Sequence, residues 1–337
     1  MSSKGKFSLH PQDSPRRGLD LALLTVSGLV VIALLSALTI NLLDQSQRHV
    51  EKVRQTHVPG PSGSKVLERE NEADILVQEQ VNKNLQTTEI AFEHYELTDA
   101  GLKYVGKLTN LKNLSLGFTR ISDSGIKYLV KLPLESLSLC STDITDGALD
   151  HIARIKTLRY LNLSETNITD EGIQKLRSLG DLNDLHLMAT NVSGATLREL
   201  VEFHQPLWKL VLTNTNISDD DMPALVQLEN LEWLTLDGTR ITGQELQKLG
   251  QCKKLRTLGL VNCDIKDSDV KRLVASCPTL ETLDLSRTNV TGDCLVSLAN
   301  LKRLKRLVLN RDHNISPGNL KKFRERRPDV NVQTTVL

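Results

Sequence analysis

The chain contains the stretch Leu111-Lys112-Asn113-Leu114-Ser115-Leu116-Gly117-Phe118-Thr119-Arg120-Ile121, which sets a pattern LxxLxLxxTxI. The pattern returns eight more times at intervals of 23 to 25 residues, and its first leucines are then Leu134, Leu158, Leu182, Leu207, Leu231, Leu255, Leu280 and Leu304. A fixed period of this length is typical of repeat proteins, in which each repeat forms one coil. We number the nine coils 1 to 9. A degenerate copy precedes them, with Ile90, Phe92, Tyr95 and Leu97 in the matching places, and Val330-Asn331-Val332 is expected to add a final short strand.

Each coil has the features of a strand followed by a helix. In LxL both leucines lie on one face of a short strand and the middle residue lies on the other. Pairs such as Thr145-Asp146 and Thr169-Asp170 then predict helix N-caps. Because one coil cannot bury its own apolar edge, we expect the coils to stack. The predicted fold of residues 86–337 is therefore an α/β solenoid, a right-handed horseshoe with a concave parallel sheet and convex helices.

A small polar residue recurs just beyond each strand. We expect its side chain to bond the backbone of the neighbouring coil, since buried backbone groups need partners. The column consists of Thr119, Thr142, Thr166, Thr190, Thr215, Thr239 and Thr288, with Cys263 in the same place.

These residues resemble leucine-rich repeats of the ribonuclease-inhibitor-like and cysteine-containing kind, over residues 86–337. The segment from Cys252 to Ile265 is similar to the cysteine-containing repeats of F-box substrate receptors, although no F-box-like segment is evident. Together with the apolar segment described next, the chain looks like the membrane-anchored repeat proteins of bacteria. The resemblance implies a concave face that binds proteins and no enzymatic activity, but it does not identify a partner.

An uncharged segment near the N-terminus predicts a membrane anchor. Residues 21–43 contain no charge, and as a helix they would span about 34 Å, enough for a bilayer core of about 30 Å. A cleaved signal peptide and a buried soluble helix are the alternatives. The positive charges before the segment favour a cytoplasmic tail at 1–20 and an extracytoplasmic repeat domain at 86–337, joined by a juxtamembrane linker at 44–85. Residues 65–85 are either an amphipathic helix on the first repeat or a solvated tether.

Composition limits the possible functions. The 337 residues carry 42 Lys and Arg against 41 Asp and Glu, so a strongly basic nucleic-acid binder is excluded. Five cysteines without a CxxC pair argue against a zinc site or a disulfide framework. Cys252 and Cys277 hold the same place in adjacent coils and are either bonded or two buried thiols. We expect no cofactor, no metal and no catalysis, since no nucleophile motif, oxyanion site or phosphate loop is present.

The scarce aromatic residues predict a binding surface on the concave face. Only 3% of the chain is aromatic, yet both tryptophans and Tyr160 fall in the central coils. Tryptophan and tyrosine are frequent interface anchors, so we expect a protein or peptide partner rather than a small molecule. The alternative is a partly buried pair that packs on the lateral rim, where Trp208 is the better candidate. The predicted site consists of Tyr160, Asp184, His186, Trp208, Lys209, Trp233 and Asp237.

A second candidate surface is basic. Residues 301–337 contain ten Lys or Arg against three Asp or Glu, so this end of the chain suits an anionic polymer or is simply a solvated cap. The predicted anion-binding residues are Arg287, Lys305, Arg306 and Arg311. The alternative to any binding function is an architectural envelope component without a dedicated partner.

Overall fold

The computed structural model describes residues 72–92, 96–310 and 315–335, which lie within one compact unit at Leu67–Leu337. The predicted tail, the predicted transmembrane helix at 21–43 and the first part of the predicted linker lie outside the described residues, as does Arg311. Among the helices that are described, none is both long and apolar enough to cross a bilayer.

The described residues form a parallel sheet of eleven strands in sequence order. The nine patterned coils supply β2 to β10, the degenerate copy supplies β1, and the predicted last strand is β11, so the prediction of a parallel repeat sheet is confirmed. The strands are β1 (Glu89–Ala91), β2 (Asn113–Ser115), β3 (Ser136–Ser138), β4 (Tyr160–Asn162), β5 (Asp184–His186), β6 (Lys209–Val211), β7 (Trp233–Thr235), β8 (Thr257–Gly259), β9 (Thr282–Asp284), β10 (Arg306–Asn310) and β11 (Asn331–Thr335).

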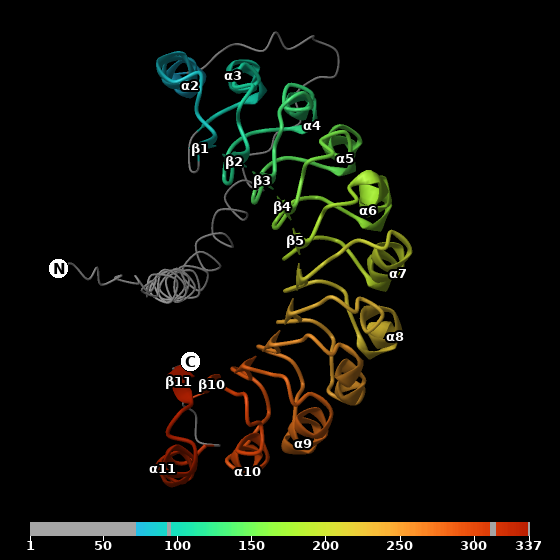
Figure 1. The fold of residues 1–337 in the computed structure, drawn as a ribbon, viewed down its shortest axis with the longest axis vertical. Coiled ribbons are helices and arrows are strands. Elements are labelled where there is room, and N and C mark those ends of the chain that lie inside the picture. The colour runs from blue at the N-terminus through green and yellow to red at the C-terminus, as the bar shows by residue number, and fades with distance from the viewer. Residues whose placement is uncertain (1–71, 93–95, 311–314, 336–337) are drawn as a thin grey trace, which may run out of the picture. The chain divides into compact units, whose positions relative to one another are not determined.

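Helical segments connect the strands and lie on the outer side of the arc that this unit forms, with the sheet on its inner side (Figure 1). Three are short 3-10 helices, η1 (Leu176–Ser178), η2 (Asp219–Asp221) and η3 (Leu246–Gln251). The α-helices are α2 (Glu72–Lys83), α3 (Asp99–Val105), α4 (Asp123–Ile126), α5 (Asp146–Ile152), α6 (Asp170–Lys175), α7 (Gly194–Glu202), α8 (Met222–Leu225), α9 (Asp267–Ser276), α10 (Cys294–Leu298) and α11 (Pro317–Arg326).

The core is a continuous aliphatic spine between the sheet and the helices. In β7, for example, Leu234 and the following Leu236 are fully buried, whereas Trp233, which precedes Leu234 on the strand, is only half-buried. The alternation expected from LxL is therefore confirmed. Helix α2 belongs to the same spine, because Val77 and Val81 are buried against α3. Of the two alternatives for residues 65–85, the described part is a packed helix.

The recurring threonine is buried as expected, but its partner differs from the prediction. Thr166 Oγ1 donates to the carbonyl of Leu163 in its own coil, at 2.5 Å, and Thr119 makes the same bond to Leu116 at 2.6 Å. The expected bond to the neighbouring coil was wrong, because the carbonyl three residues earlier in the same turn is the nearer acceptor. Only Cys263 reaches across, with its Sγ 3.2 Å from the Leu236 carbonyl.

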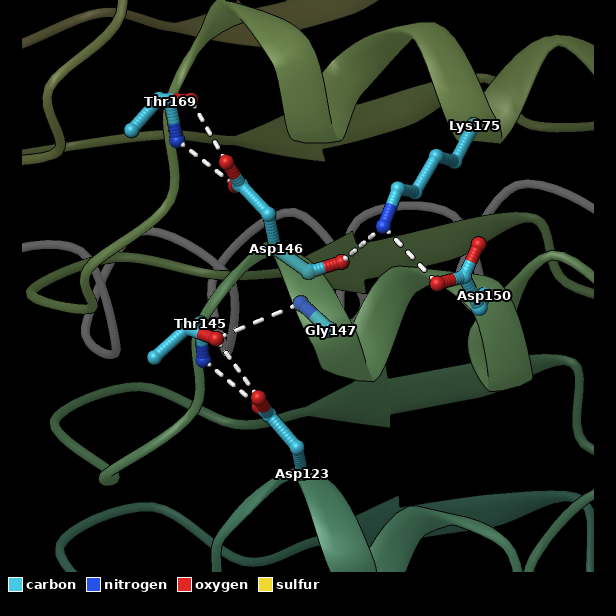
Figure 2. A network of polar contacts seen from close by, with 7 residues as sticks. All are labelled: Asp123, Thr145, Asp146, Gly147, Asp150, Thr169 and Lys175. Carbon is cyan, nitrogen blue, oxygen red and sulfur yellow. Dashed lines mark hydrogen bonds and ion pairs between the residues drawn. The ribbon is translucent and has the colours of Figure 1, made fainter.

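Bonds between coils come instead from an aspartate in the first turn of most of the helical segments. Asp123 accepts from the backbone N–H of Thr145 at 2.7 Å and from its hydroxyl at 2.6 Å (Figure 2). Asp146 binds Thr169 in the same way at 2.9 and 2.6 Å. We call this series the aspartate ladder. Its other members are the pairs Asp74–Thr98, Asp99–Ser122, Asp170–Ser193, Asp219–Thr242 and Asp267–Thr291.

Three coils have glycine in place of the ladder aspartate. A Cβ on Gly194 would lie 1.6 Å from Oδ1 of Asp221, which comes from the next coil and accepts from the Ser218 N–H at 3.0 Å. Asp269 occupies the corresponding space beside Gly243, and Asn319 the space beside Gly292. The polar group is thus retained, but it comes from the other coil.

None of the five cysteines, all of which lie in the described parts of the chain, forms a disulfide. Cys252 and Cys277 are buried, and burial raises the pKa of Cys252 to about 11. This agrees with the alternative of two small buried side chains.

Candidate functional site

The concave face carries the side chains that lie on either side of the middle strand residue. Register places Tyr160 beside Asp184, Asp184 beside Lys209, and Lys209 beside Trp233 on the parallel strands β4 to β7. The next column along the strands brings His186 of β5 between Asn162 and Val211. The pattern therefore predicted correctly which residues are neighbours.

Five of the seven predicted residues form one connected cluster. The rings of Tyr160 and His186 meet edge to face, with centroids 5.2 Å apart. Lys209 Nζ lies 5.0 Å from the centre of the Trp233 ring and 3.6 Å from Asp184 Oδ2. We call Tyr160, Asp184, His186, Lys209 and Trp233 the concave cluster.

Asp184 is the centre of the concave cluster. It is only 8% exposed, and its Oδ1 lies 2.9 Å from His186 Nε2. The two atoms are within ion-pair distance but form no hydrogen bond, and both are buried without any other partner. Asp184 therefore joins the His186 ring to the Lys209 ammonium group.

Two predicted residues lie elsewhere. Trp208 precedes β6 on the entry edge, which is the side of the sheet where the strands begin. It is 41% exposed there, and its Nε1 donates to Asn183 Oδ1 at 3.2 Å. The alternative of a rim position therefore holds for Trp208 and not for Trp233.

Asp237 leans away from the concave cluster towards coil 7. Its Oδ1 accepts from the Val261 N–H at 2.8 Å, and the carboxylate occupies the space where Gly259 lacks a Cβ, 2.6 Å from an added atom. Burial raises the pKa of Asp237 to about 7, and the charge of Asp284 adds to the rise. The sequence pattern gave no indication of this shift in pKa. It is possible because Gly259, in the coil between those of Asp237 and Asp284, leaves room for the Asp237 carboxylate.

The described members of the predicted anion-binding set, Arg287, Lys305 and Arg306, do not gather into one site. Arg287 follows β9, whereas Lys305 precedes β10, so the two lie at opposite edges of the parallel sheet. Lys305 Nζ is 2.5 Å from Glu281 Oε2, and Arg306 donates to Gln333 Oε1 at 2.9 Å on the concave side. Arg287 has a left-handed backbone with φ of 57°, like the corresponding residue of every coil from 1 to 7.

No cluster of three or more metal-ligating side chains occurs in the described parts of the chain. The concave cluster consists of aromatic rings, one buried carboxylate and one cation that lies over a ring. Such a surface is suited to contact with another chain.

Two family models match the sequence. The model described as "FBD-associated F-box protein At5g56370, LRR repeats" matches residues 205–314, and the "Leucine Rich repeat" model matches residues 107–130 and 155–176. The coils in these segments are leucine-rich repeats. No curated protein matches the chain.

Solved structures include several similar chains. An internalin (InlF) from Listeria monocytogenes is 19% identical with a TM-score of 0.38, over 76% of this chain and 88% of that one. The PEPR1–AtPEP1 structure is 18% identical with a TM-score of 0.45, over 74% of this chain and 35% of that one. The Leptospira interrogans LRR protein LIC12759 is 19% identical with a TM-score of 0.43, over 68% and 74%.

Proposed function

We propose that the repeat unit is an interaction module that binds a protein or peptide through the concave cluster. The observation that carries this proposal is the continuous contact of Tyr160, His186, Asp184, Lys209 and Trp233 across four neighbouring strands. The repeat fold supports it, since leucine-rich repeats commonly mediate contacts between proteins.

The cluster has the composition of an interface centre. Tyr160 and Trp233 supply large rigid rings, and few other side chains in this chain offer comparable apolar area. Lys209 is already held between a carboxylate and a ring, so little side-chain freedom is lost when a partner covers it. Residues of this kind typically account for most of the binding free energy.

Electrostatics favours a partner with a hydrogen-bond donor. Asp184 is buried, with its Oδ1 2.9 Å from His186 Nε2 and its Oδ2 3.6 Å from Lys209 Nζ. A backbone N–H or an amide of a bound peptide would displace the His186 ring to reach this carboxylate, and the hydrogen bond would then add specificity.

The test is a comparison of paired variants against a fixed peptide. A peptide is selected from a displayed random library on the wild-type chain, and its Kd is measured by fluorescence anisotropy. Changing Tyr160 and Trp233 together to alanine should weaken the Kd at least a hundredfold without lowering the melting temperature. Trp208→Ala is the matched control, because it removes an equally large ring from the entry edge and should change the Kd less than threefold.

The proposal fails if the double variant binds as tightly as the wild type, or if Trp208→Ala weakens binding equally. Selection that yields no saturable peptide would favour an architectural role without a dedicated partner. We expect no enzymatic activity and no cofactor in either case.

We further propose that residues 21–43 anchor the chain in a membrane, with residues 1–20 cytoplasmic and the repeat unit outside the cytoplasm. The support is the uncharged run of 23 residues and the basic residues that precede it. Protease treatment of intact cells should degrade the repeat unit and leave a short protected fragment. Full protection of the repeat unit would contradict this orientation.

A further inference from the structure

The entry edge of the sheet carries a column of alternating charge. Lys112 pairs with Glu135 at 2.8 Å in coils 1 and 2. Further along, Arg256 pairs with Glu232 at 3.5 Å and with Glu281 at 2.5 Å, and Glu281 also pairs with Lys305. The column is therefore largely self-neutralised.

A second set of cations on the same edge lacks this neutralisation. Lys253 Nζ donates to the Gly250 carbonyl at 2.5 Å, and Lys254 Nζ donates to Asn230 Oδ1 at 2.7 Å. Both acceptors are uncharged, so the positive charges stay uncompensated. Neither lysine, nor Arg303, forms an ion pair with a carboxylate in the part of the chain that the structure describes.

These cations surround a hollow. It has a volume of about 290 Å³ and is lined by Glu232, Lys253, Lys254, Arg256, Thr279 and Arg303, which makes four cations against one carboxylate. The hollow exists because coil 8 has the short pair Pro278-Thr279 where coil 7 has Lys253-Lys254 and coil 9 has Lys302-Arg303. The long cationic side chains of coils 7 and 9 therefore stand on either side of a low floor.

The dimensions suit one tetrahedral oxyanion. Lys254 and Arg303 hold equivalent places two coils apart, so their backbones are separated by about 10 Å at the usual strand spacing. In the structure Lys254 Nζ lies on Asn230 of coil 6, so it would turn from that acceptor to meet a ligand above Thr279. A volume of about 290 Å³ admits a phosphate group together with water or the chain that bears it.

Thr279, at the bottom of the hollow, cannot donate a hydrogen bond to a ligand. Its hydroxyl donates to the Leu255 carbonyl at 2.7 Å, so it offers an oxygen lone pair and no proton. Recognition therefore depends on the cations, and arginine provides the fork that matches two phosphate oxygens.

We propose that this hollow on the entry edge of coils 6 to 9 binds a phosphoryl group, held between Lys254 and Arg303 with Lys253 adding charge. The site is separate from the concave cluster, and it differs from the residues that the sequence suggested for anions. The group is either free phosphate or one unit of a polyphosphate chain, and both present the same dianionic oxygens.

The test measures binding of inorganic phosphate and of polyphosphate to the full chain at 20 mM and 150 mM salt, by ³¹P NMR and by calorimetry. The double variant Lys254→Gln and Arg303→Gln should raise the Kd of whichever probe binds at least tenfold. Lys131→Gln with Lys271→Gln is the control, because both lysines are exposed on other surfaces and the net charge falls equally. The control should change the Kd less than twofold.

The outcomes separate the two sources. If the affinity for polyphosphate, expressed per phosphate unit, is similar to that for inorganic phosphate, the ligand is the free ion. Much tighter binding of polyphosphate, with a steep loss at 150 mM salt, would identify the polymer. The proposal is overturned if neither probe binds, or if the hollow variant and the control lose affinity equally. Binding of the concave peptide should be unchanged in all of these variants, so this site and the proposed protein-binding function are tested separately.

Discussion

The aspartate ladder predicts strong energetic coupling between Asp123 and Gly147. Asp123 accepts two hydrogen bonds from Thr145, and its carboxylate fills the space beside Gly147 (Figure 2). An added Cβ on Gly147 would lie 2.5 Å from Asp123 Oδ2 and 3.2 Å from its Cγ. Once the carboxylate is removed, the nearest of these atoms is the Cβ at position 123, at 3.6 Å, which is an ordinary contact.

The magnitudes follow from these contacts. Hydrogen bonds to a carboxylate contribute about 1.5 to 3 kcal/mol when buried, and Thr145 is exposed, so Asp123→Ala should cost about 2 kcal/mol. Gly147→Ala should cost about 1 to 2 kcal/mol, because overpacking outweighs the gain of about 1 kcal/mol from alanine in a helix. In the Asp123→Ala background the clash is gone, so Gly147→Ala should stabilise by up to about 1 kcal/mol.

Equilibrium unfolding in urea, followed by far-ultraviolet circular dichroism, measures the cycle, with equal m-values as the check on a common mechanism. The expected coupling is about 2 kcal/mol. Gly180→Ala is the control, because an added Cβ there meets nothing within 4 Å, and its effect should add to that of Asp123→Ala. If the two ladder substitutions add within about 0.5 kcal/mol, the carboxylate does not occupy the space beside Gly147 and the ladder geometry is wrong.

Three further predictions concern ionisation and exposure. The folded state raises the pKa of Asp237 to about 7, so the protonated group contributes stability that is fully present below pH 4 and is lost as the pH rises to 7. In urea unfolding, the free energy of unfolding of the wild type should fall by up to about 4 kcal/mol over that range relative to Asp237→Asn. Parallel pH curves for the two proteins would contradict this. In single-tryptophan variants, Trp208 should be quenched by acrylamide more strongly than Trp233, and equal quenching would contradict their different positions. Of the five thiols, the half-buried Cys140 should react first with a thiol reagent in the folded chain, and rapid reaction of Cys252 would show that it is not buried.

Much of the fold was predictable because its rules act at short range. Alternation in LxL determines which side chains enter the spine, and the period determines which coil lies next. The threonine column shows the limit of such reasoning. A repeated polar residue at a bend must bond something, but the choice between its own coil and the neighbouring coil depends on the local path of the backbone, which the pattern does not contain.

The ladder was missed for a different reason. Within one coil, a helix-capping role fully explains Asp123 or Asp146, so the pattern alone predicts no bond to the next coil. The bond to the next coil becomes visible only when coils are stacked in register. In retrospect the glycines at 194, 243 and 292, each followed by a polar residue in the next coil, were the sequence feature that indicated a shared space.

The sequence predicted which residues belong to the concave cluster, but it did not predict which of their side chains touch. Column positions identified Tyr160, His186, Lys209 and Trp233 as neighbours, because strand register fixes which backbones adjoin. Side-chain rotamers decide that Lys209 lies over Trp233, and that Asp237 turns towards Val261 instead of joining the cluster. These choices depend on local packing and on which N–H groups need an acceptor.

Hydrogen-bond satisfaction separates the parts of the molecule that hold the fold from the part available to a partner. The ladder aspartates of Figure 2 have both carboxylate oxygens bonded, and the column threonines have their hydroxyl protons bonded, so these groups have no remaining need that a ligand must meet. In the concave cluster, by contrast, Asp184 Oδ1 and His186 Nε2 are buried and have only their 2.9 Å contact with each other. If the cluster only stabilised the fold, replacing Asp184 with asparagine would remove its ion pairs with His186 and Lys209 and would leave peptide binding unchanged. If the cluster receives a partner's donor, Asp184→Asn should weaken peptide binding at least tenfold while leaving the melting temperature within a few degrees of the wild type.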